Sequence, residues 1–178
     1  NAARQQERVA LFEVGAVYLA QEGDLNAQPK ELRRLGIVLF GDRHERSWTM
    51  PTAEYDFYDI KGILESLLDV DGISWECSTN PSFHPFRQGQ IVLDGKVLAV
   101  YGEIHPTAAR NFKISGRVYA AEVDLELLLE HQESVIRYRE ISRYPRIDRD
   151  LAVLVNRNQP VAELLNLIEQ EGGELLYD

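Results

Sequence analysis

The chain has 178 residues, of which 44% are hydrophobic and 27% charged, proportions typical of a water-soluble globular protein with room for one full domain and part of another. Its net charge of −10 argues against a domain that binds nucleic acid by itself, because such domains need cations to contact phosphate. No apolar run approaches the roughly 20 residues of a transmembrane helix, and a single cysteine excludes an intrachain disulfide and a Cys-rich zinc site.

These bounds favour a reducing, cytoplasmic location. We expect no secretory signal at the start of the chain, and Asn1-Ala2 resembles a cloning remnant, so the fold is considered from residue 3 onward. The one cysteine, Cys77, lies in an expected strand. Since free cysteines are usually buried and inert, we interpret Cys77 as structural and not as a nucleophile.

The first part of the chain predicts two strands and a helix. Residues 8–20 combine apolar and β-branched side chains typical of a strand, in which Gly15 is a candidate break, and a polar loop follows. The run at 33–41 is short and nearly all apolar, which predicts a buried strand. After another polar loop, apolar residues recur at helical spacing from Asp56, a suitable N-cap, and Gly72 lies where this helix is expected to stop.

The middle of the chain predicts a strand at 73–79 and then a hairpin. The apolar runs "QIVL" and "KVLAVY" are joined by Asp94-Gly95, the residues that a two-residue type I′ turn prefers. Pro106 suits the first position of a short helix, because the N–H that proline lacks would be unpaired there. A strand over 117–125 and a short helix, "LELLLEH", are expected next.

The end of the chain predicts a strand at 150–155 and a helix opened by Pro160, whose apolar residues follow helical spacing up to Gly172-Gly173. The final "ELLYD" begins a further element. This order is typical of the β-α-β opening of another domain, which seldom folds alone at such a length. The whole pattern predicts an α+β fold with a largely antiparallel sheet flanked by helices.

Three residues form the strongest candidate site. His84, Glu103 and His105 could serve a metal-dependent enzyme as ligands or as acid–base groups, since Glu103 and His105 point to one face of a strand. Zinc sites usually include a close ligand pair, such as histidines at i and i+4, whereas these histidines are far apart in sequence. Each histidine also precedes a proline, which favours the alternative that each imidazole forms a hydrogen bond at a chain reversal.

Other catalytic signatures are absent from the sequence: it has no Gly-x-Ser-x-Gly elbow, no phosphate-binding loop and no dinucleotide fingerprint. Asp56 and Asp59 are interpreted as charges that favour a helix N-terminus and not as a catalytic dyad. The mixed-charge stretch "DRHER" is expected to be a solvated loop.

A nucleic-acid-binding module is a further alternative, with phosphate contacts from Arg143, Arg146 and Arg149. Arginines beside aspartates more often belong to a solvated linker, and the net negative charge also argues against this alternative.

Four stretches, in this order, resemble the beta subunit of bacterial phenylalanyl-tRNA synthetase: "ERVALFEVGAVY", "SW…YDFYDIKGILESLL", "FHPFRQGQIVLDGKVLAVYGEIHP" and "SRYPRIDRDLAVLV". Any one alone would be a weak match, but together they extend over nearly all of the chain. The resemblance implies a C-terminal fragment of that subunit. Residues 3–140 would form a non-catalytic module related to class II synthetase catalytic domains, and 141–178 the truncated β-α-β start of a ferredoxin-fold anticodon-binding domain.

The resemblance also implies how the parent enzyme works. ATP and phenylalanine would be activated on the alpha subunit, with Mg²⁺ required by the parent enzyme and no cofactor in this fragment. The beta module would support a heterotetramer of two alpha and two beta subunits, and tRNA(Phe) would be bound through the complete anticodon-binding domain. No catalytic residue and no metal ligand is carried over, and Arg143, Arg146 and Arg149 remain the candidate tRNA contacts. Phe86 replaces the small residue that the family usually has after the first His-Pro, so no contact is assigned there.

Overall fold

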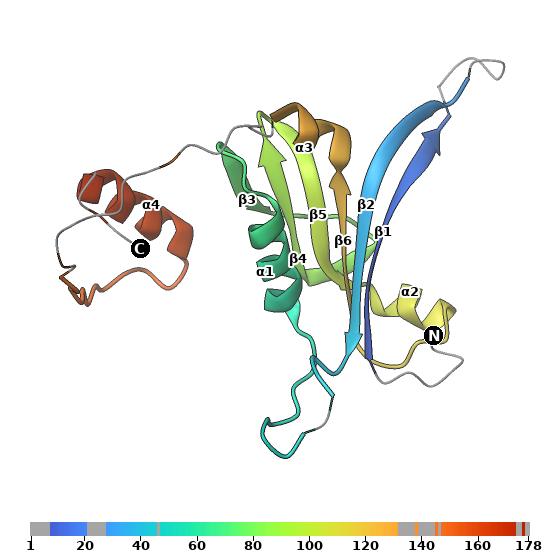
Figure 1. Cartoon of the computed structure of the whole chain (residues 1–178), viewed down its shortest axis with the longest axis horizontal. Coiled ribbons are helices and arrows are strands. Elements are labelled where there is room, and N and C mark those ends of the chain that lie inside the picture. Colours follow the sequence, from blue (N-terminus) through green and yellow to red (C-terminus); the bar gives the residue numbers. More distant parts are fainter. Residues whose placement is uncertain are drawn as a thin grey trace. The chain divides into compact units, whose positions relative to one another are not determined.

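The computed structural model describes residues 8–20, 28–45, 47–131, 138, 145, 147–173 and 176. The chain divides into two units, 1–135 and 136–178, and each is considered by itself. The expected domain boundary between residues 140 and 141 lies outside the described residues. The first unit contains a six-stranded antiparallel sheet with helices packed on it (Figure 1), which confirms the expected α+β class.

The sheet has the order β1-β2-β6-β5-β4-β3. Its strands are β1 (Arg8–Leu19), β2 (Lys30–Gly41), β3 (Ile73–Cys77), β4 (Phe83–Leu93), β5 (Lys96–Ile104) and β6 (Val118–Asp124). The helices of the first unit are α1 (Phe57–Leu67), α2 (Pro106–Asn111) and α3 (Leu125–His131), and the second unit contains α4 (Val161–Gly172).

The first two strands form a long ribbon at one edge of the sheet. β1 pairs with β2 residue by residue, from Arg8 opposite Gly41 to Leu19 opposite Lys30. The expected break at Gly15 is wrong, because Gly15 keeps its partner Arg34 and the ladder continues through it. β2 begins at Lys30, earlier than the apolar run predicted, since its polar first residues are paired with β1 as well.

Helix α1 begins as the sequence predicts. The Asp56 side chain accepts hydrogen bonds from the backbone N–H groups of Tyr58 and Asp59, and the Asp59 side chain accepts from the N–H of Asp56. This reciprocal capping box satisfies backbone donors that a helix N-terminus otherwise leaves unpaired. The expected stop at Gly72 is wrong: α1 ends at Leu67, and Gly72, with φ of +81°, lies in the turn that precedes β3.

The hairpin between β4 and β5 is confirmed. Asp94 and Gly95 have φ of 49° and 75°, the positive values that a type I′ turn requires at both central residues. Pro106 is the first residue of α2, as expected. The strand and helix predicted after it correspond to β6 and α3.

The hydrophobic core lies on one face of the sheet, beneath α1. On β2 and β6 the register places Leu35, Ile37 and Leu39 opposite Val123, Ala121 and Tyr119, and all six side chains are buried. Ile60 and Leu64 of α1 are fully buried against this face. The main strand contacts of α1 are with β5 and β6, and those of α3 are with β2 and β6.

The second unit departs from the expected β-α-β order. The strand predicted at 150–155 is wrong: this segment has no regular structure, and its apolar side chains are exposed. A strand is stabilised by hydrogen bonds to a neighbouring strand. The described part of this unit contains no strand with which residues 150–155 could pair. The helix is confirmed as α4, with Pro160 as its N-cap and Gly173 as its C-cap. No described helix of the chain is long and apolar enough to cross a membrane.

Candidate functional site

The two histidines of the predicted site both take part in local backbone contacts. His84 lies near the start of β4, and its Nδ1 accepts a hydrogen bond from the backbone N–H of Phe86 at 3.2 Å. His105 is the N-cap of α2, and its Nδ1 accepts from the N–H of Thr107, also at 3.2 Å. Each imidazole thus accepts a local backbone hydrogen bond, which His105 does at the strand-to-helix junction as the alternative predicted, whereas His84 does so within β4.

Glu103 is buried and paired with arginine. Its side chain is only 5% exposed, and Arg87 donates to it from Nε at 2.5 Å and from Nη2 at 3.0 Å. The hydrogen bond to Glu103 is the main cause that raises the pKa of Arg87. The Nε of Arg117 lies 4.0 Å from the same carboxylate. This carboxylate is therefore neutralised by a bidentate partner, which is typical of a structural ion pair.

A backbone irregularity brings Arg87 to Glu103. The pairing of β4 with β5 shifts register between Phe83 and Gln88. On β5, the residue before Glu103 is Gly102, which pairs with Gln88 and has φ of +151°. A Cβ at Gly102 would lie 2.4 Å from the carbonyl oxygen of Arg87. Only glycine allows so close an approach of two backbones. The bulge and this glycine together place the guanidinium over the carboxylate.

The proposed metal site does not form. His84 and His105 do lie at the same open end of the hairpin, since Phe83 pairs with Ile104. Across the residues with described positions, however, no three His, Cys, Asp or Glu side chains make a group that could hold a metal ion. The geometry thus does not favour a metal-dependent enzyme built on His84, Glu103 and His105.

The aspartate pair at α1 has a partner that the sequence did not indicate. Arg43 donates from Nη2 to Asp56 at 2.8 Å and from Nε to Asp59 at 2.9 Å. The hydrogen bond to Asp59 is the largest cause that raises the pKa of Arg43. The "DRHER" stretch is expected from the sequence to be a solvated loop, and the Arg43 side chain is 39% exposed, but its ion pairs also tie this loop to the start of α1. The interpretation of the aspartates as helix N-terminal groups is confirmed.

Two buried tyrosines stay protonated at neutral pH. Burial is the main cause that raises the pKa of Tyr101 to about 12, with smaller effects from Glu65 and Cys77. Burial likewise raises the pKa of Tyr119. The Tyr101 ring stacks on Phe57 with a centroid distance of 5.4 Å. Both phenols therefore act as packing groups of the core.

The remaining candidates are exposed or undescribed. Cys77 is the last residue of the edge strand β3 and is exposed. The expectation that Cys77 is buried, on which its structural interpretation depended, is therefore wrong. Arg143 and Arg146 lie outside the described residues, and Arg149 is exposed in a segment without regular structure.

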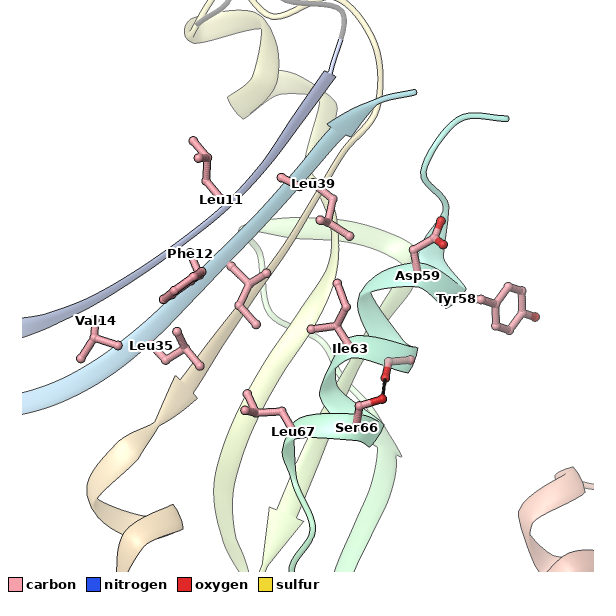
Figure 2. A pocket seen from close by; sticks show the side chains of 13 residues that line it. Leu11, Phe12, Val14, Leu35, Leu39, Tyr58, Asp59, Ile63, Ser66 and Leu67 are labelled. Carbon is pink, nitrogen blue, oxygen red and sulfur yellow. Dashed lines mark hydrogen bonds between the residues drawn. The ribbon is translucent and has the colours of Figure 1, made fainter. Parts of the chain in front are cut away.

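The sequence interpretation missed a concave feature of the first unit. An apolar groove of about 870 Å³ lies between the β1–β2 ribbon and α1 (Figure 2). Its lining residues are Ala10, Leu11, Phe12, Val14, Leu35, Ile37, Leu39, Tyr58, Asp59, Gly62, Ile63, Ser66 and Leu67. A signal was present in the sequence: Ile63 and Leu67 form an apolar pair at i and i+4 in addition to the buried face of the helix.

Comparisons with known proteins agree along the whole chain. Residues 1–125 match the family described as the phenylalanyl tRNA synthetase beta chain CLM domain. The phenylalanine–tRNA ligase beta subunit of Geobacillus kaustophilus is 37% identical over 182 residues, which is 100% of this chain and 22% of that protein. The corresponding protein of Symbiobacterium thermophilum is 35% identical over 181 residues, 100% of this chain and 20% of that protein. In Clostridium acetobutylicum the identity is 33% over 180 residues, 99% of this chain and 21% of that protein.

The chain thus spans about a fifth of the length of these curated relatives. Among solved structures, one titled "Structure of Desulfitobacterium hafniense PylSc, a pyrrolysyl tRNA synthetase" aligns with a TM-score of 0.45 and 17% identity, over 72% of this chain and 43% of that chain.

Proposed function

Because the chain belongs to the family of phenylalanyl-tRNA synthetase beta chains, we propose that it is a non-catalytic structural part of the phenylalanine–tRNA ligase beta subunit. In this proposal the module supports the alpha subunit, which joins phenylalanine to tRNA(Phe) with ATP. The parent enzyme is a heterotetramer of two alpha and two beta subunits in the cytoplasm.

The observation that carries the proposal is that buried and half-buried charged side chains of the module form ion pairs with one another. Arg87 binds Glu103, and Arg43 binds both Asp56 and Asp59. Each pair secures a bulge, a cap or a loop. These side chains therefore maintain the shape of the module, which is what a supporting part of an enzyme needs.

The roles of cofactors and tRNA follow from the same proposal. ATP and Mg²⁺ act on the alpha subunit, and the described residues of this chain do not fit a Mg²⁺ site, since they contain no group of three acidic or histidine ligands. The first unit corresponds to a class II synthetase catalytic architecture. The tail corresponds to the start of a ferredoxin-fold anticodon-binding domain, whose strands would form once neighbouring strands are available for pairing. Arg143, Arg146 and Arg149 are its candidate tRNA contacts.

The test is aminoacylation by the alpha subunit combined with full-length beta subunit that carries His84→Ala or His105→Ala. We expect kcat to stay within about twofold of wild type, because loss of a general acid or base usually costs about 10²- to 10⁴-fold. His44→Ala, at a partly exposed loop position outside the candidate site, is the matched control. A loss of about 100-fold in a complex that still elutes as the intact assembly would contradict the proposal. So would aminoacylation by this chain without the alpha subunit.

A further inference from the structure

We propose that the apolar groove is filled, in the full-length beta subunit, by an amphipathic α-helix from a segment of the same polypeptide that lies outside this chain. This inference rests on the proposed function, because it takes the chain to be part of a longer beta subunit.

The dimensions of the sheet leave room for one more helix. Six strands spaced about 4.8 Å apart make a sheet roughly 24 Å wide, whereas a helix with its side chains is about 10–12 Å across. Helix α1 packs on β5 and β6. Helix α3 also contacts β2 and β6, so the uncovered width of about one helix lies over β1 and the part of β2 that α3 does not reach.

The floor of the groove is a continuation of the hydrophobic core. The register places Phe12 of β1 opposite Ile37 and Val14 opposite Leu35, so these side chains share the core face of the sheet. The residues of β2 are nearly inaccessible, with Ile37 at 6% and Leu35 at 7% exposed, and both belong to the core cluster. Their neighbours on β1 are uncovered, with Phe12 at 76% and Val14 at 55% exposed. The core thus extends to β1 without the layer that would cover it.

The side wall of the groove suits a helix. Ile63 and Leu67 point from α1 toward β2, whereas Tyr58 points away (Figure 2). Gly62 also lines this wall, and an added Cβ there would meet nothing within 4 Å. A second helix can therefore approach α1 closely. Apolar residues at i, i+3, i+4 and i+7 would contact Ile63 and Leu67 on one side and the strands on the other.

The electrostatics favour a neutral contact face. Asp59 is the charged residue among those that line the groove, and its carboxylate is already bound by Arg43. A filling helix therefore needs no cation on its buried face, and its contacting residues are of the Leu, Ile, Val or Ala type.

The position and size of the groove indicate the same polypeptide as the source. Its floor is continuous with the core cluster through Leu35, Ile37 and Leu39, so an occupant would extend the core of the module, as a further segment of the same polypeptide does. About four-fifths of the length of the relatives lies outside this chain, which is ample for one helix. A helix of the alpha subunit or a second copy of this chain are the competing occupants, and the experiment separates them.

The experiment places a photo-cross-linker in the groove of the full-length beta subunit, purified without the alpha subunit, as Phe12→p-benzoylphenylalanine. After irradiation, mass spectrometry identifies the linked peptide. We expect a link within the same polypeptide, at a yield independent of protein concentration, to a segment with apolar residues at helical spacing. Phe112→p-benzoylphenylalanine, also exposed but outside the groove, is the matched control and should not link to that segment. Linkage to another copy, linkage that appears only with the alpha subunit, or no linkage overturns the inference.

A second measurement does not depend on the cross-linker. Leu67→Cys is labelled with maleimide in this chain and in the full-length beta subunit, and the rate is read for the corresponding peptide. Protection by a packed helix should slow labelling by about tenfold or more in the full-length protein, whereas Glu65→Cys, on α1 but outside the groove lining, should change by less than about threefold. Equal rates at position 67 overturn the inference. Aminoacylation of the same variants with the alpha subunit reports separately on the proposed function, which stands if activity is retained while the groove proves empty.

Discussion

The pair formed by Arg87 and Glu103 gives the sharpest test of what holds this sheet together. Arg87→Met keeps a long side chain but leaves the Glu103 carboxylate, 5% exposed, without its bidentate donor. Removal of one partner from a buried ion pair usually costs about 3–5 kcal/mol. The Arg87 side chain is itself 38% exposed and Arg117 remains 4.0 Å from the carboxylate. We therefore expect a loss of about 2–3 kcal/mol in the free energy of unfolding, since solvent screens part of the interaction.

The assay is urea unfolding followed by circular dichroism, with the midpoint and slope fitted separately. The double variant Arg87→Met/Glu103→Leu should recover at least half of the loss, because it also removes the stranded buried charge. Arg110→Met, at an exposed position of α2, is the matched control and should change stability by less than about 0.5 kcal/mol. A loss below about 1 kcal/mol for Arg87→Met, or a double variant no more stable than the single one, would refute a structural role for this pair.

Three further predictions follow from features of the same unit. Asp56→Ala should lower the free energy of unfolding by about 1–2 kcal/mol in urea titrations, whereas Asp56→Asn, which can still cap, should lower it less; equal losses would contradict the cap. Burial raises the pKa of Tyr101 to about 12, above the roughly 10 of an unfolded phenol. Stability that is present below pH 10 should therefore be lost as the pH rises toward 12, by about 2–3 kcal/mol, and Tyr101→Phe should lack this part of the alkaline loss; parallel pH profiles for the two proteins would be the contrary result. Gly102→Ala should unfold at clearly lower urea, because its Cβ would lie 2.4 Å from a backbone oxygen; an unchanged midpoint would show that the backbones can separate freely.

Features set by neighbouring residues could be predicted from the sequence. The Asp56 cap, the Asp94-Gly95 turn and Pro106 at the start of α2 each depend on a few adjacent residues with strong conformational preferences. Helix α1 could also be predicted, but its end could not. Its C-cap residue Leu68 is buried, so tertiary packing and not a glycine decides where the helix stops.

Features set by the order of strands could not be predicted. Whether Cys77 is buried depends on β3 being an edge strand, which no local pattern reveals. The partners of Glu103 and Asp59 are arginines 16 residues away in sequence, brought close by a bulge and by a returning loop. The segment 150–155 has a strand-like composition but lacks a paired neighbour in the described part of its unit. Composition alone does not supply the hydrogen bonds that make a strand.

Strand β1 has a consequence for how this chain behaves when it is handled on its own. It is an edge strand paired on one side over twelve residues, and its sequence "RVALFEVGAVYL" contains no proline and no lysine. Such an edge is a template on which further chains can add as strands. The growth of these assemblies rises steeply with protein concentration. The unpaired backbone N–H and C=O groups along β1 therefore limit the concentration at which this chain can be stored or crystallised. A lysine on the outer face of β1, for example at Val17, which does not line the groove, would raise that concentration limit.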